Sequence, residues 1–113
     1  MKYCQLGKGV YQYYKNYVKG NQHVSHQLAQ RKLTRNIALA FKFSDEYYIY
    51  GNLHIQLKGN TIVQLINHKG EPAKWFYKNM KKYHYLNKIM KINELDIRDK
   101  QEFEMAQNEF KSA

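Results

Sequence analysis

Hydrophobic and polar residues follow a period of two most clearly between residues 47 and 67. Three segments rich in β-branched, aromatic and aliphatic residues follow one another there: Tyr47 to Tyr50, Leu53 to Lys58 and Thr61 to Asn67. Gly-Asn pairs separate them, and such pairs suit tight hairpin loops because glycine adopts a positive φ without steric cost. The pattern predicts an antiparallel meander of three to four strands.

The middle segment of this meander indicates one buried face and one polar face. Its apolar and polar residues alternate, and the two sets are Leu53, Ile55 and Leu57 against His54, Gln56 and Lys58. Successive side chains of a strand point to opposite faces, so the first set is expected in the core and the second in solvent.

Two short basic helices are predicted before the sheet. Residues 24–32 contain no Gly or Pro, and Ser25 can cap the first amides of a helix there. Thr34 is the expected N-cap of a second helix, whose packed stripe would be Ile37, Ala38 and Phe41.

The first 22 residues form a Tyr- and Lys-rich segment with one predicted helix that ends near Gly20. The side chains expected to pack are Val10, Tyr14, Tyr17 and Val18. Aromatic rings among cations also suit single-stranded nucleic acid, on which each stacked base contributes about 1–3 kcal/mol. The side chains left for that role are Tyr11, Tyr13 and Lys15.

Residues 72–113 are predicted to form a helical extension that starts at Glu71-Pro72, because proline is tolerated in the first turn of a helix. Its apolar stripe consists of Trp75, Phe76, Met80, Tyr83, Leu86 and Met90. Lys78, Lys81 and Lys82 lie between these positions and add to the positive charge. From residue 93 onward, acidic residues cluster in the first turns of a predicted last helix, where they complement its dipole, and its buried side would be Phe103, Ala106 and Phe110.

These elements define an α+β fold, and 113 residues suit one domain, 1–113. The formal net charge is +10, and the first 44 residues contain no acid at all. Such a field attracts polyanions, so RNA or a ribonucleoprotein is the expected partner. A basic protein made soluble by its charge is the alternative explanation.

Several functional classes are disfavoured. Cys4 is the single cysteine, so no internal disulfide forms, and His23 with His26 lacks the further ligands that a metal site needs. No phosphate-cradling glycine loop and no serine or cysteine hydrolase signature is visible. We therefore expect no cofactor, no metal and no membrane span, and a cytoplasmic site of action.

One stretch of the chain, residues 23–68, resembles a known family of nucleases. The matching residues, in order, are His23, Gln27, Leu28, Arg31, Leu33, Thr34, Tyr48, Tyr50, Gly51, Leu53 and Gly59 to Val63. Their order and spacing resemble small families of the barnase/EndoU/colicin/RelE-like RNase superfamily. Two positions depart from that pattern: Gln27 replaces the usual Arg, and Gln64 replaces the usual Thr or Ser.

The resemblance implies metal-independent RNA cleavage, in which a neighbouring 2′-hydroxyl attacks the phosphate with the help of a base, an acid and cations. It implies that His23 is the general base or acid and that Arg31 contacts the scissile phosphate. His54 and Gln64 are further catalytic candidates that would line the same cleft. The expected phosphate contacts are Lys32, Arg35, Lys58 and the lysines of the C-terminal helix.

Three functions stay open from the sequence. The first is an endoribonuclease or RNA-targeting toxin of the RelE/colicin-like class, with an acidic antitoxin or immunity protein as partner. The second is a non-enzymatic nucleic-acid- or ribonucleoprotein-binding inhibitor, such as a mobile-element or phage counter-defence protein, which the departures at Gln27 and Gln64 favour. The third is a ribosome-associated factor that binds rRNA without cleaving it.

Overall fold

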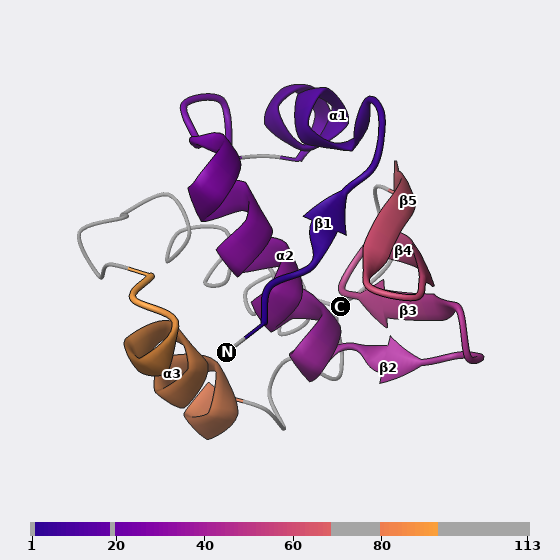
Figure 1. Ribbon diagram of the computed structural model, residues 1–113. Coiled ribbons are helices and arrows are strands. Elements are labelled where there is room, and N and C mark those ends of the chain that lie inside the picture. Colours follow the sequence, from indigo (N-terminus) through magenta and orange to yellow (C-terminus); the bar gives the residue numbers. More distant parts are fainter. Residues whose placement is uncertain (1, 19, 69–79, 93–113) are drawn as a thin grey trace, which may run out of the picture.

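The computed structural model describes residues 2–18, 20–68 and 80–92, which contain three helices and five strands (Figure 1). The helices are α1 (Val10–Tyr17), α2 (His26–Leu39) and α3 (Met80–Ile89). The strands are β1 (Gln5–Leu6), β2 (Phe41–Lys42), β3 (Tyr47–Tyr50), β4 (Leu53–Lys58) and β5 (Thr61–Asn67). The predicted α+β class is confirmed.

The predicted meander is present with the expected bounds as β3, β4 and β5, which pair antiparallel. Gly51 and Gly59 each have a φ of 60°, whereas Asn52 and Asn60 have negative φ. A positive φ at the first loop residue alone is the signature of a type II′ hairpin turn, whose twist matches that of the flanking strands. Both turns therefore require glycine at that position.

Two short edge strands extend this sheet beyond the predicted number of strands. β2 pairs antiparallel with β3, and β1 pairs parallel with β5, so the order is β1-β5-β4-β3-β2. The prediction that Phe41 belongs to a helical stripe is wrong, because Phe41 lies opposite Ile49 in this sheet. Each edge strand has two residues, which is too short to show a period in the sequence.

A single helix, α2, replaces the two predicted helices before the sheet. Ser25 is its N-cap, as predicted, and its hydroxyl accepts a hydrogen bond from the Leu28 amide at 3.1 Å. Thr34 is inside the helix and not a cap. Its hydroxyl donates to the Gln30 carbonyl at 2.7 Å and accepts from the Cys4 amide at 2.9 Å. Because the hydroxyl is satisfied in this way, it does not interrupt the helix.

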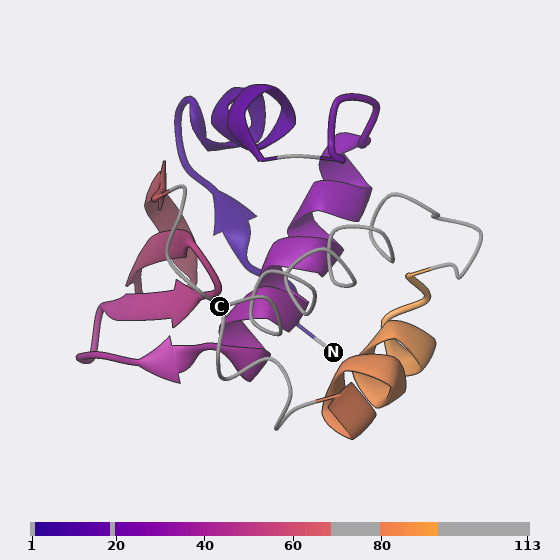
Figure 2. The same cartoon turned by 180° about the vertical axis from the view of Figure 1, so that it is seen from behind.

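The central element is α2, which lies between the sheet and α3 (Figures 1 and 2). Its buried residues cover an arc of roughly 160° of the helix, at about 100° per residue: Ala29, Lys32, Leu33, Arg35, Asn36 and Leu39. The predicted stripe is wrong at Ala38, which is exposed, whereas Ile37 is half-buried and packs against the core. A helix with neighbours on two sides buries more than one stripe.

The packing of α1 follows the prediction except at its last residue. Val10, Tyr14 and Val18 are buried in the core. The predicted burial of Tyr17 is wrong: it is 58% exposed, and its ring lies against that of Tyr13 with centroids 4.8 Å apart. The last turn of α1 therefore directs this ring away from the core.

The predicted apolar stripe of the C-terminal helix is confirmed at three of its four described positions and is wrong at Met80. Tyr83, Leu86 and Met90 are buried, whereas Met80 is at the surface. The predictions for Trp75, Phe76, Lys78 and residues 93–113 lie outside the described residues.

Candidate nucleic-acid interface

Lys32, an expected phosphate contact, is buried in the protein. Its side chain is 1% exposed, and its ammonium donates a hydrogen bond to the side-chain oxygen of Asn21. The ammonium also lies 5.9 Å from the centre of the Tyr14 ring. This burial contradicts the expected role, because a phosphate contact needs a cation at the surface.

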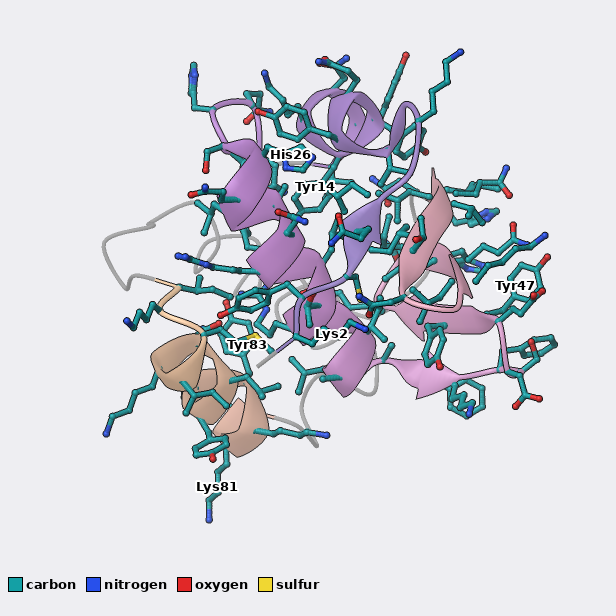
Figure 3. The ribbon with its side chains drawn as sticks, viewed as in Figure 1. Lys2, Tyr14, His26, Tyr47, Lys81 and Tyr83 are labelled. Atoms are coloured by element: carbon teal, nitrogen blue, oxygen red, sulfur yellow. The ribbon has the colours of Figure 1, made fainter. Side chains whose placement is uncertain are left out.

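Arg35 is also 1% exposed, and it connects α2 to α3. Its Nε and Nη2 atoms donate to the side-chain oxygen of Asn36 at 3.1 and 2.8 Å, and Nη1 donates to that of Asn87 at 2.9 Å. The guanidinium lies 4.8 Å from the centre of the Tyr83 ring, which Figure 3 places between the two helices. The prediction of a phosphate contact is therefore contradicted for Arg35 as well.

The tyrosines expected to be free for stacking are engaged within the fold. The Tyr11 hydroxyl donates to the Val24 carbonyl at 2.8 Å, and the ammonium of Lys15 lies 5.2 Å from the Tyr11 ring centre. The Tyr13 hydroxyl accepts a hydrogen bond from the Asn67 amide at 2.8 Å. Both rings are half-buried and tie α1 to its neighbours, so they are less available than the exposed Tyr17.

Two of the four catalytic candidates lie on or beside α2. His23 is exposed in the turn before the helix, two residues before the cap Ser25. Arg31 is half-buried, and its guanidinium lies 5.8 Å from the ring centre of Tyr3, just before β1. Both therefore belong to the helical side of the sheet.

The other two candidates lie on the opposite side. Residues that pair across antiparallel strands share a face, so the register defines an outer sheet face that points away from α2. We use this name for Phe41, Tyr47, Ile49, His54, Gln56, Gln64 and Ile66. Figure 3 shows Tyr47 projecting from the sheet on the side away from α2.

His54 and Gln64 meet other polar side chains on the outer sheet face. The ring of His54 lies 4.1 Å from that of His68, centre to centre, and Gln64 pairs with Gln56, two residues from His54. The register thus places His54 and Gln64 on one face of the sheet, with His68 beside His54, but leaves His23 and Arg31 on the other side. The expectation of one cleft lined by His23, Arg31, His54 and Gln64 does not match this arrangement.

A cluster of exposed aromatic rings at one end of the outer sheet face was not predicted. Phe43 is 71% exposed, Phe41 57% and Tyr47 44%. Phe43 continues the alternation of β2, and its amide donates to the Tyr47 carbonyl at 2.9 Å, so it lies beside Tyr47. We call these three residues the aromatic end. The alternation of Phe41, Lys42 and Phe43 was the signal that could have revealed it.

The remaining predicted phosphate contacts within the described residues are at the surface. Lys58, Lys81 and Lys82 are exposed, and Figure 3 shows Lys81 pointing away from the protein. Lys82 also donates to the Ala38 carbonyl at 2.9 Å, near the end of α2, where a cation complements the helix dipole.

Neither a metal-binding cluster nor a helix that could cross a membrane is found among the described residues. Within residues 2–18, 20–68 and 80–92, no three His, Cys, Asp or Glu side chains are grouped so that they could hold a metal ion. Across the described helices, none is long and apolar enough to cross a membrane.

Fold and surface together define an α+β protein whose mostly antiparallel sheet is backed by a central helix and carries an aromatic and polar outer face. The chain matches the YorE family over residues 4–89, from the start of β1 to the end of α3, and it belongs to that family. No curated protein and no solved structure matches it. A fold alone does not imply a function, so the function of this protein depends on its surface residues.

Proposed function

We propose that this protein binds RNA through its basic surface. The observation that carries the proposal is the charge balance of the described residues. They contain twelve Lys or Arg and two acids, Asp45 and Glu46. Lys32 and Arg35 are buried, which leaves ten exposed or half-buried cations against two exposed carboxylates.

Such an excess favours a polyanionic partner. Each phosphate that a cation neutralises releases a condensed counterion, so binding is favoured by entropy at low salt. The potential of exposed lysines extends over about 8 Å at physiological ionic strength, so lysines on separate elements act together on a long ligand. Both carboxylates lie in the turn between β2 and β3, and they reduce the field only there.

The experiment is a titration of fluorescein-labelled RNA, followed by anisotropy, between about 50 and 200 mM salt. The logarithm of the association constant should fall linearly with the logarithm of salt, with a slope of about −0.7 per phosphate contact for a single strand. Replacing the exposed Lys81 with Ala should weaken binding to all sequences alike and make the slope shallower. A slope near zero for the parent protein would refute the proposal.

A second candidate, metal-independent endoribonuclease, is favoured by one observation. The rings of His54 and His68 lie 4.1 Å apart, centre to centre, with an angle of 52° between their planes, and Gln64 is on the same outer sheet face. Cleavage by the 2′-hydroxyl needs one group to remove its proton and another to protonate the leaving 5′-oxygen, and two histidines can fill these roles near neutral pH.

The two possible active sites, one on the outer sheet face and one around His23 and Arg31, can be distinguished by mutation. Purified protein should cleave total RNA in the presence of EDTA. If the outer sheet face is the active site, His54→Ala and His68→Ala should abolish cleavage while His23→Ala keeps it. If the resemblance identifies the active site, His23→Ala should abolish it. Intact RNA with the parent protein would reject the enzyme and leave the binding proposal standing.

A further inference from the structure

We infer that the aromatic end, Phe41, Phe43 and Tyr47, stacks the bases of single-stranded RNA. This inference rests on the proposed RNA binding and specifies that the bound RNA is single-stranded. The observation is that three large aromatic side chains of one hairpin are 44–71% exposed. Phe41 and Tyr47 share the outer sheet face by register, and the Phe43 amide donates to the Tyr47 carbonyl. Single exposed apolar residues are ordinary, whereas a contiguous cluster marks an interaction site.

The spacing of these rings suits an extended strand of bases. Phe43 directly follows β2 and is two residues from Phe41, which corresponds to about 7 Å in an extended chain. Phe43 lies beside Tyr47 on the neighbouring strand, about 5 Å away between backbones. Bases that are not paired expose both faces and can stack on such rings, whereas paired bases in an RNA duplex are buried in their own stack.

A cation lies at the same corner of the sheet. Tyr47 pairs with Gln56, and Lys58 follows two residues later on the same face of β4. The Leu57 amide donates to the Glu46 carbonyl at 2.7 Å, which holds the β2–β3 turn against this end of β4. Lys58 is exposed, so its ammonium can contact the phosphate next to a stacked base.

The acidic residues of the β2–β3 turn reduce the positive charge near the aromatic end. Lys42 pairs with Asp45 at 3.6 Å, and both side chains are largely exposed, so this is a weak surface pair. Phosphate attraction at this corner therefore comes mainly from Lys58, and stacking supplies the larger share of the local affinity. This balance predicts that the aromatic end discriminates single strands from duplexes more than it attracts RNA in general.

The test compares a labelled uridine-rich single strand with an RNA hairpin of the same phosphate count. Phe43→Ala should weaken single-strand binding about 5- to 150-fold, the equivalent of one lost stack. Phe43→Trp should keep binding within a few-fold, and its indole fluorescence should be quenched by the single strand. The salt slope and hairpin affinity should not change, because no counterion is released at a ring.

Tyr85→Ala is the matched control, since Tyr85 is 61% exposed on α3, away from the aromatic end. It should bind the single strand like the parent. Phe43→Ala and Tyr85→Ala should both keep the parent melting temperature, because neither ring is in the core.

The possible failures are distinguishable. If the parent binds RNA with a salt-dependent affinity but Phe43→Ala is unaffected, the stacking inference is overturned and RNA binding stands. If the parent prefers the hairpin, the inference is equally overturned. If Phe43→Ala instead changes the oligomeric state in sedimentation, the aromatic end belongs to an interface between copies. If no RNA binds, the proposed function fails first.

Discussion

Arg35 offers the sharpest test of the conclusion that part of the basic helix is structural. Arg35→Ala would remove three hydrogen bonds to Asn36 and Asn87 and the contact with the Tyr83 ring. The buried amide oxygen of Asn36 and the half-buried one of Asn87 would each lose a donor, at a cost of about 1–3 kcal/mol for a fully buried group. A desolvated cation–π contact adds about 2 kcal/mol, and the relief of a buried charge offsets part of the sum.

We therefore expect Arg35→Ala to destabilise the protein by about 3–5 kcal/mol, a large part of the about 5–15 kcal/mol typical of a domain. With a urea m-value of about 1.5 kcal/mol/M, the unfolding midpoint should fall by about 2–3 M. Far-ultraviolet circular dichroism in a urea titration measures this midpoint directly.

Arg31→Ala is the matched control for Arg35→Ala. Arg31 lies four residues earlier on the same helix, is half-buried, and has its guanidinium near one ring, that of Tyr3. Its removal should lower the free energy of unfolding by about 1 kcal/mol or less. An Arg35→Ala protein with the parent midpoint but weaker RNA binding would refute the structural role and restore the phosphate contact.

Three further changes test the local architecture. Gly7→Ala should destabilise the protein by about 1–3 kcal/mol, because the new Cβ would lie 2.7 Å from the Ile62 carbonyl oxygen next to the β1–β5 pair. A melting temperature equal to that of the parent would contradict this close approach. Ser25→Ala should cost about 1 kcal/mol through loss of the α2 cap, and Ser25→Asp should recover it, as chemical denaturation of both variants can show. Gly59→Ala should cost about 1–2 kcal/mol from its φ of 60° alone, since open space surrounds the new Cβ; an equal midpoint for parent and variant would reject the turn assignment.

The elements that could be predicted from the sequence are those set by local chemistry. The bounds of β3, β4 and β5 follow from alternation and from two glycine turns, all within twenty-one residues. The Ser25 cap is equally local, because its hydroxyl bonds an amide three residues away. The alternation of β4 also predicted correctly that His54 lies on the opposite face from Ile55.

The features that could not be predicted depend on partners far away in the chain. β1 becomes a strand because it pairs with β5, more than fifty residues later. Arg35 is held by Asn87, fifty-two residues away, so nothing near Arg35 in the sequence distinguishes it from a surface cation. Thr34 is ambiguous locally, since a threonine can cap a helix or bond back to the carbonyl four residues earlier.

The position of α2 explains why the basic residues of this helix misled the prediction. A helix between a sheet and a second helix buries a wide arc of its surface, and only three of the six buried residues of α2 are apolar: Ala29, Leu33 and Leu39. Lys32 and Arg35 fill two of the remaining positions, with their charges bonded to the amide oxygens of Asn21, Asn36 and Asn87. Positive charge on a central helix therefore does not indicate a nucleic-acid surface. Among the residues that the structure describes, the fully exposed cations lie on the N-terminal segment, the turns, the sheet and α3, and the RNA-binding proposal depends mainly on them.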